Sequence, residues 1–91
     1  MSNQVPGGWS AFSFTLTPQA KEVFASALSD WTGAAYTPFA FASQVVAGAN
    51  YCFLCEAQFT TYPTTENAVL LYVFAPLSGK PIVHKIVPIS P

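Results

Sequence analysis

The stretch Gln44-Val45-Val46-Ala47-Gly48-Ala49-Asn50-Tyr51 decides how this chain folds. Residues 39–46 have the composition of a strand, and small, conformationally permissive residues separate them from a second apolar run that begins at Tyr51. This pattern predicts a β-hairpin that turns near Gly48. The tip would contain Val45, Val46 and Ala47, where turns exposed to water usually have polar residues. We therefore expect a binding partner at this tip.

After this hairpin the sequence alternates between strands and turns. Residues 51–61 have the alternating pattern of a strand whose side chains lie on two opposite faces. A turn cluster over residues 62–67 follows, and residues 68–74 and 82–87 are two further strand-like runs. Proline, serine and glycine within residues 76–81 separate these runs and predict a second hairpin.

Before the first hairpin, a strand and a helix are expected. Residues 9–16 alternate between apolar and polar side chains, which predicts a first strand. The apolar set comprises Phe12, Phe14 and Leu16. Thr17 and Pro18 then predict a helix start, with Thr17 as the N-cap, and Thr32-Gly33 predicts its end. The helix would have one apolar stripe, made of Ala20, Val23, Phe24, Ala27, Leu28 and Trp31.

These elements predict an α+β fold in the order β-α-β-β-β-β. One N-terminal helix would pack across a curved antiparallel sheet. The 91 residues are enough for a single domain with one modest core, preceded by an extended tail over residues 1–8. No internal repeat or linker divides the chain.

The predicted order and three short motifs resemble the cystatins, and among them the stefins. Gln44-Val45-Val46-Ala47-Gly48 followed by Asn50-Tyr51 is similar to the first inhibitory hairpin of that family. Val5-Pro6-Gly7-Gly8-Trp9-Ser10 resembles the opening segment of stefins, and Thr17-Pro18 begins the helix at nearly the stefin spacing. The resemblance covers most of the chain and implies the cystatin fold.

The resemblance also implies a function, which is reversible competitive inhibition of papain-like cysteine proteases. In cystatins the tail and two hairpins form a wedge that fills the protease cleft. The matching positions are Val5, Pro6, Gly7 and Gly8 in the tail, Gln44, Val45, Val46, Ala47 and Gly48 in the first hairpin, and Pro76, Leu77, Ser78 and Gly79 in the second. Stefins have Leu-Pro in the second hairpin, whereas this chain has the reversed Pro76-Leu77. A weaker or differently shaped contact is expected there.

The low charge of the chain argues against two classes of partner. Charged residues make up 8% of the sequence and the net charge is -1, so no basic track for nucleic acid is expected. The longest uncharged stretch, residues 32–55, is interrupted by Pro38, Gly48 and Asn50, so it does not predict a membrane span. No signal peptide is visible, which favours a cytoplasmic protein and leaves a secreted mature form open.

No catalytic or metal site is expected. Cys52 and Cys55 would lie on opposite faces of a strand, too far apart for a disulfide, and the single His84 could not complete a four-ligand zinc site with them. The two cysteines are predicted to be small buried residues. His84 is predicted to be a surface strand residue, and the four carboxylates fall on separate elements. We therefore expect neither enzymatic activity nor a cofactor.

Two alternatives to protease inhibition stay open. A non-inhibitory interaction or assembly module is favoured by aromatic residues beyond what one helix can cover and by weakly protected sheet edges. These aromatic residues include Phe39, Phe41, Phe53, Phe59, Tyr62, Tyr72 and Phe74. The resemblance implies one route to a homodimer, domain swapping through the first hairpin. A ligand carrier that uses the concave face of the sheet is the other alternative, but the sequence does not indicate convergent polar groups.

Overall fold

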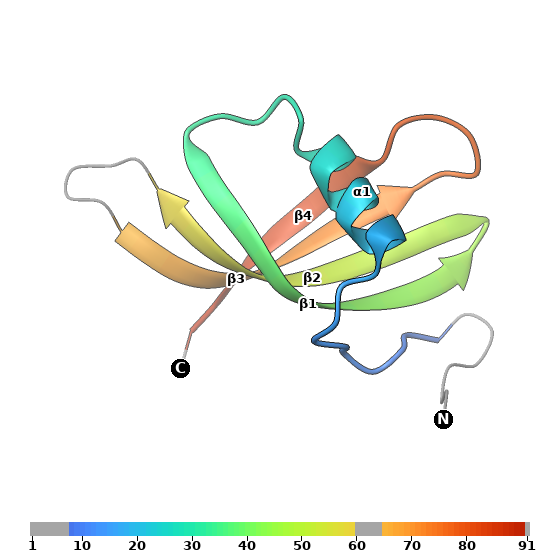
Figure 1. Cartoon of the computed structure of the whole chain (residues 1–91), viewed down its shortest axis with the longest axis horizontal. Coiled ribbons are helices and arrows are strands. Elements are labelled where there is room, and N and C mark those ends of the chain that lie inside the picture. Colours follow the sequence, from blue (N-terminus) through green and yellow to red (C-terminus); the bar gives the residue numbers. More distant parts are fainter. Residues whose placement is uncertain (1–7, 60–64, 91) are drawn as a thin grey trace.

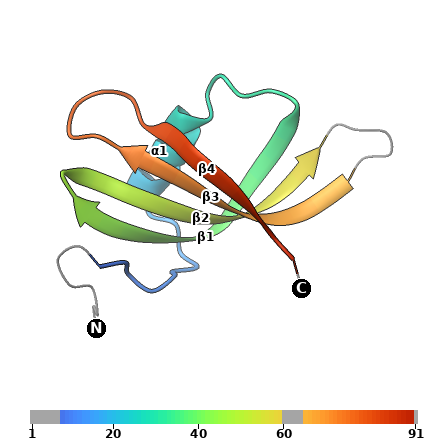
Figure 2. The same ribbon diagram turned by 180° about the vertical axis from the view of Figure 1, so that it is seen from behind.

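The computed structural model describes residues 8–59 and 65–90 of the chain. Within these residues it has one helix and one sheet of four antiparallel strands in the order β1-β2-β3-β4 (Figure 1). The elements are α1 (Pro18–Ala27), β1 (Ala34–Val46), β2 (Gly48–Phe59), β3 (Thr65–Ala75) and β4 (Ile82–Ile89). The helix covers one face of the sheet, and no helix covers the opposite face, which we call the open face (Figures 1 and 2). The predicted α+β class is confirmed at this level.

The start of α1 follows the sequence signals, but its end does not. The Thr17 hydroxyl accepts a hydrogen bond from the Ala20 N–H at 3.1 Å, and Pro18 occupies the first turn. The α-helix ends at Ala27 rather than near Gly33, and a looser turn follows, in which the Trp31 N–H donates to the Leu28 carbonyl at 3.0 Å. Serine, aspartate and threonine in residues 28–32 favour turns over helix, which explains the early end.

The core lies between α1 and the covered face of β2 and β3. Phe53 is fully buried, and its ring meets that of Phe24 edge-on at 5.0 Å between centroids. Around this pair lie Ala20, Ala27, Tyr51, Cys55, Ala57, Val69, Leu71 and Val73. The described residues include no buried charged or polar side chain. Burial of apolar surface is therefore the main source of stability.

The predicted first strand is not a regular strand. Residues 9–16 make two isolated bridges to β1, Trp9 with Gln44 and Ser13 with Phe41. Between the bridges the Ser10 hydroxyl accepts from the Ser43 N–H at 3.0 Å, and at the second bridge the Ser13 hydroxyl accepts from the Thr15 N–H at 3.2 Å. Serine side chains thus compete with the backbone for hydrogen bonds, which interrupts the ladder.

The apolar residues of this segment also differ from their predicted placement. Leu16 packs against the core, but Phe12 and Phe14 are exposed. Phe14 stacks on Phe39 of β1 with 6.5 Å between ring centroids. Phe12 lies beside Ala42, Cys52 and Tyr72 on the open face, so neither phenylalanine fills the core under the helix.

Candidate functional site

The two predicted hairpins turn at the same end of the sheet. The first connects β1 to β2 through Ala47, and residues 76–81 connect β3 to β4. Because β2 and β3 are antiparallel, with Ala49 opposite Ala75, the start of one strand meets the end of the other. Both turns lie at the right-hand end of the molecule in Figure 1. We refer to this end as the hairpin edge.

Gly48 joins the two hairpins by direct packing. Its φ of +100° lies in the region that glycine adopts without strain, as expected in a short hairpin loop. A Cβ added at Gly48 would collide with the Ala75 carbonyl oxygen and would lie 3.1 Å from Pro76 Cα and 3.2 Å from Leu77 N. Only glycine allows the second hairpin to approach the first this closely.

A side-chain hydrogen bond braces the first hairpin just below its tip. Gln44 and Asn50 are directly opposite each other on β1 and β2. The Asn50 amide donates from Nδ2 to Gln44 Oε1 at 2.8 Å, so the Gln44 carbonyl is engaged within the hairpin. This contact restricts both side chains and fixes the register next to the turn.

The described part of the N-terminal tail runs alongside the first hairpin. Trp9 bridges to Gln44, and the Ser10 N–H donates to the Ser43 carbonyl at 2.8 Å. Gly8 immediately precedes this contact, so the tail enters the structure beside β1 near the hairpin edge. The predicted tail residues Val5, Pro6 and Gly7 lie outside the described residues.

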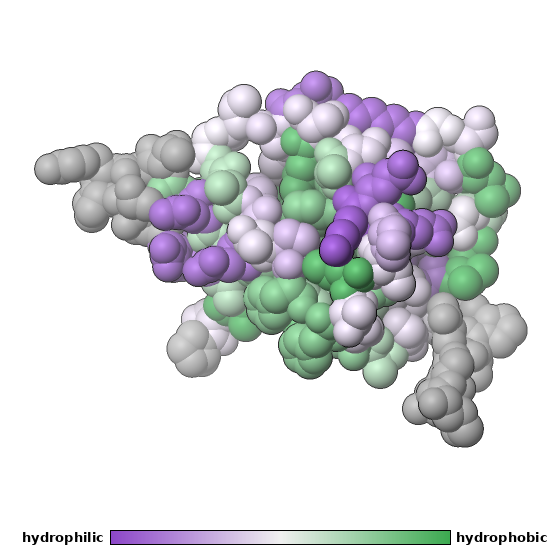
Figure 3. Space-filling view, viewed as in Figure 1, coloured by the Kyte–Doolittle hydropathy of each residue, from purple (hydrophilic) through white to green (hydrophobic). Residues whose placement is uncertain are grey.

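Apolar side chains project from both hairpin tips. Val45 and Leu77 are 61% and 84% exposed, and Val46 is exposed as well. Ala47, Ser78 and Gly79 are also exposed, whereas Pro76 is half-buried beside Gly48. Hydrophobic residues are visible at this end of the molecule in Figure 3. The structure thus brings together the predicted residues of the two hairpins.

An ion pair attaches the second hairpin to the turn after α1. Lys80 Nζ lies 3.0 Å from Asp30 Oδ2. Both side chains are largely exposed, so the pair contributes little to stability and mainly limits the positions that the loop adopts.

The two cysteines are buried and unpaired, as predicted. Burial raises the pKa of the Cys55 thiol from 9.0 to about 12, which makes it a poor nucleophile. Burial also raises the pKa of Cys52, although a hydrogen bond with Tyr72 and the charge of Lys85 oppose the shift. Among the described residues no three His, Cys, Asp or Glu side chains gather where a metal ion could bind. No helix within residues 8–59 and 65–90 is long and apolar enough to cross a membrane.

Sequence reasoning missed three residues that shape the hairpin edge. Asn50 was assigned to the turn, yet it braces Gln44. Ala75 was not singled out, although its carbonyl backs Gly48. Trp9 was assigned only to the start of the first strand, but it lies on the open face of the sheet and contacts Tyr72. Only the Gln44–Asn50 pair could have been found from sequence, because the two residues are symmetric about Ala47.

Comparison with models of known protein families found no match, and comparisons with curated proteins and with solved structures found none either. The resemblance to the cystatins therefore rests on the motifs of the sequence and on their order along the chain.

Proposed function

We propose that this domain is a reversible competitive inhibitor of papain-like cysteine proteases. The hairpin edge would enter the active-site cleft, with the tail of residues 5–8 alongside it. The fold would then be of the cystatin type, with residues 9–16 in the place of its first strand. The observation that supports the proposal best is the packing of Gly48 on Ala75, which holds two exposed apolar tips in one orientation.

The physical case depends on rigidity. A hairpin that is ordered before binding loses little conformational entropy when it enters a cleft, so more of the contact energy appears as affinity. The Gln44–Asn50 hydrogen bond and the close packing at Gly48 both supply such order. Val45, Val46 and Leu77 would then contribute apolar contact without placing a peptide bond in line with the catalytic cysteine.

The test is a titration of the monomer, isolated by size exclusion, against papain with a fluorogenic peptide substrate. Competitive inhibition in the nanomolar to micromolar range is expected. An absence of inhibition by verified monomer at high micromolar concentration would contradict the proposal.

A matched pair of variants locates the inhibitory surface. Val46→Asp places a charge at the hairpin edge, whereas Ile89→Asp places one at the opposite end of the sheet; the two side chains are 40% and 43% exposed. Val46→Asp should raise the inhibition constant at least about tenfold by speeding dissociation, and Ile89→Asp should leave it unchanged. Equal effects of the two variants would contradict the assignment of the edge.

A second candidate function, a non-inhibitory assembly module, is favoured by one observation. The stacked pair Phe14 and Phe39 is exposed on β1, the edge strand of the sheet. A homodimer could cover this patch, or could form by exchange of strands through the first hairpin, which would bury the inhibitory tip. Sedimentation of the wild type and of Phe14→Ser separates the possibilities, because only association through the patch is lost in that variant.

A further inference from the structure

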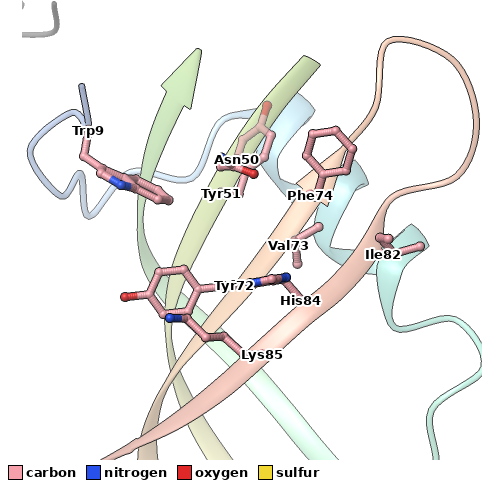
Figure 4. A pocket seen from close by; sticks show the side chains of 9 residues that line it. All are labelled: Trp9, Asn50, Tyr51, Tyr72, Val73, Phe74, Ile82, His84 and Lys85. Carbon is pink, nitrogen blue, oxygen red and sulfur yellow. The ribbon is translucent and has the colours of Figure 1, made fainter. Parts of the chain in front are cut away.

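A hollow of about 660 Å³ lies on the open face of the sheet, next to the hairpin edge. It is formed by β2, β3 and β4, with Trp9 closing one side, and α1 lies behind the sheet in Figure 4. The residues around it are Trp9, Asn50, Tyr51, Tyr72, Val73, Phe74, Ile82, His84 and Lys85.

Aromatic rings and one aliphatic side chain form its walls. Trp9 meets Tyr72 edge-on, with 6.0 Å between ring centroids and 83° between ring planes. Phe74 and Ile82 lie on the other side of the hollow in Figure 4. A flat apolar ring inserted between these walls would contact aromatic surface on two sides.

A β-bulge brings two basic residues to the base of the hollow. Tyr72 is opposite Lys85 and Val73 is opposite Val83, so His84 is an extra residue on β4 without a partner on β3. In a regular strand His84 and Lys85 would alternate between faces, but the bulge allows both to line the hollow. The convergent polar groups that the sequence did not reveal are thus supplied by a change of register.

The charges around the hollow favour an anion. Lys85 Nζ lies 4.8 Å from the centroid of the Tyr72 ring, and the ion pair found among the described residues belongs to Lys80 instead. None of the four acidic residues lines the hollow. Glu56 and Glu66 lie on the same face, but they are paired with Ala68 and Gln58, well beyond the Cys52–Tyr72 pair that borders the hollow. A carboxylate placed here would meet a lysine that has no acidic partner within residues 8–59 and 65–90.

We propose that this hollow binds a small planar aromatic carboxylate. The ring lies between Trp9 and Phe74, and the carboxylate accepts hydrogen bonds from His84 and Lys85. Asn50 limits the hollow on the side of the hairpin edge, where its amide already donates to Gln44. This site does not depend on the protease-inhibitor function, because none of the residues that line it belongs to the exposed tips Val45, Val46 and Leu77.

The probe is naphthalene-2-carboxylate, titrated into the full ¹⁵N-labelled chain and followed by amide chemical shifts. Saturable shifts should be confined to Trp9, Asn50, residues 72–74 and residues 82–85, with a dissociation constant in the micromolar to millimolar range. Naphthalene-2-methanol, which has the same ring without the charge, should bind roughly tenfold more weakly.

Two pairs of variants test the assigned contacts. Lys85→Met should weaken binding of the naphthalene carboxylate roughly tenfold and leave binding of the naphthalene methanol unchanged. The control variant Lys21→Met, on α1, should leave the affinity for both probes unchanged. Trp9→Leu should weaken the binding of both probes, whereas Trp31→Leu should weaken the binding of neither. The two tryptophan side chains are similarly exposed, at 41% and 45%. Unchanged amide dispersion confirms that each variant is folded.

Three results would overturn the proposal. One is the absence of saturable shifts up to millimolar probe, and another is a set of shifts at the hairpin tips or around Phe14 in place of the hollow. The third is equal affinity for carboxylate and alcohol in the wild-type chain, which would remove the role of Lys85.

Discussion

The Cα atom of Gly48 faces the main-chain carbonyl oxygen of Ala75 so closely that no side chain fits between them. This contact joins the turn between β1 and β2 to the end of β3. Since Leu77 follows Ala75 by two residues, the position of its exposed side chain depends on the residue at position 48.

Replacing Gly48 with alanine should destabilise the protein by roughly 2–4 kcal/mol, from positive-φ strain together with the collision with Ala75. Gly33→Ala is the matched control, because Gly33 also has a positive φ, +90°, but has open space where the Cβ would lie. The control should lose only about 1–2 kcal/mol. Urea denaturation monitored by circular dichroism measures the unfolding free energy of both variants. Equal losses of stability in Gly48→Ala and Gly33→Ala would show that the contact with Ala75 has no energetic role.

The same contact makes Gly48→Glu a poor probe of binding, because the substitution changes the shape of the hairpin edge as well as its surface. Leu77→Ala is a cleaner test of the proposed inhibitor. Leu77 is largely exposed, so the change should leave the free energy of unfolding within about 0.5 kcal/mol. Inhibition of papain should weaken by roughly three- to thirtyfold, mostly through faster dissociation, as measured by stopped-flow kinetics.

Truncation of Phe53 to alanine should cost about 3–5 kcal/mol in the free energy of unfolding. Phe53 is 0% exposed and contacts the rings of Phe24, Phe41 and Tyr51. Phe14→Ala removes the same atoms from a side chain that is 74% exposed, so it should cost less than about 1 kcal/mol. A large loss for Phe14→Ala would mean that the Phe14–Phe39 stack stabilises the sheet edge.

Alkaline pH should destabilise the fold through Cys55. Burial raises the pKa of this thiol from 9.0 to about 12, so above pH 9 the unfolded chain releases a proton that the folded chain retains. The free energy of unfolding contributed by this group is therefore constant below pH 9 and falls as pH rises toward 12, by up to about 1.4 kcal/mol per pH unit.

The measurement is the difference in unfolding free energy between the wild type and Cys55→Ala, taken at several pH values below and above pH 9. Burial also raises the pKa values of Tyr51 and Tyr72. Because both tyrosines are present in the wild type and in the variant, the difference between the two unfolding free energies removes most of the pH dependence that they cause. The difference should shrink above pH 9, and a constant difference would contradict the assigned protonation of Cys55.

Local sequence signals predicted the features that depend on neighbouring residues. Thr17-Pro18 identified the helix start, and Gly48 and residues 76–81 identified the two turns. The first strand was wrong because alternation alone does not reveal that Ser10 and Ser13 use their hydroxyls to replace ladder hydrogen bonds. The helix end was wrong because Gly33 is a strong stop signal, yet the weak helix formers before it end the helix first.

Features of the site that depend on register could not be predicted in this way. The packing of Gly48 on Ala75 requires the pairing of β2 with β3, which joins residues far apart in the chain. The convergence of His84 and Lys85 requires a bulge on β4, for which no glycine or proline within residues 82–87 gives a signal. Exposed tips, in contrast, were evident as apolar residues in predicted turns.

The contact between Gly48 and Ala75 also restricts how the hairpin edge can change in length. An insertion next to Gly48, or next to Ala75, would separate the backbones of the two hairpins at this contact. It would also change how far the other hairpin tip extends from the sheet. Ser78 and Gly79, which are exposed and lie beyond the residues that contact Gly48, have no such restriction. Variation in the second loop should therefore be tolerated, whereas the first loop can lengthen only if its neighbour is redesigned with it.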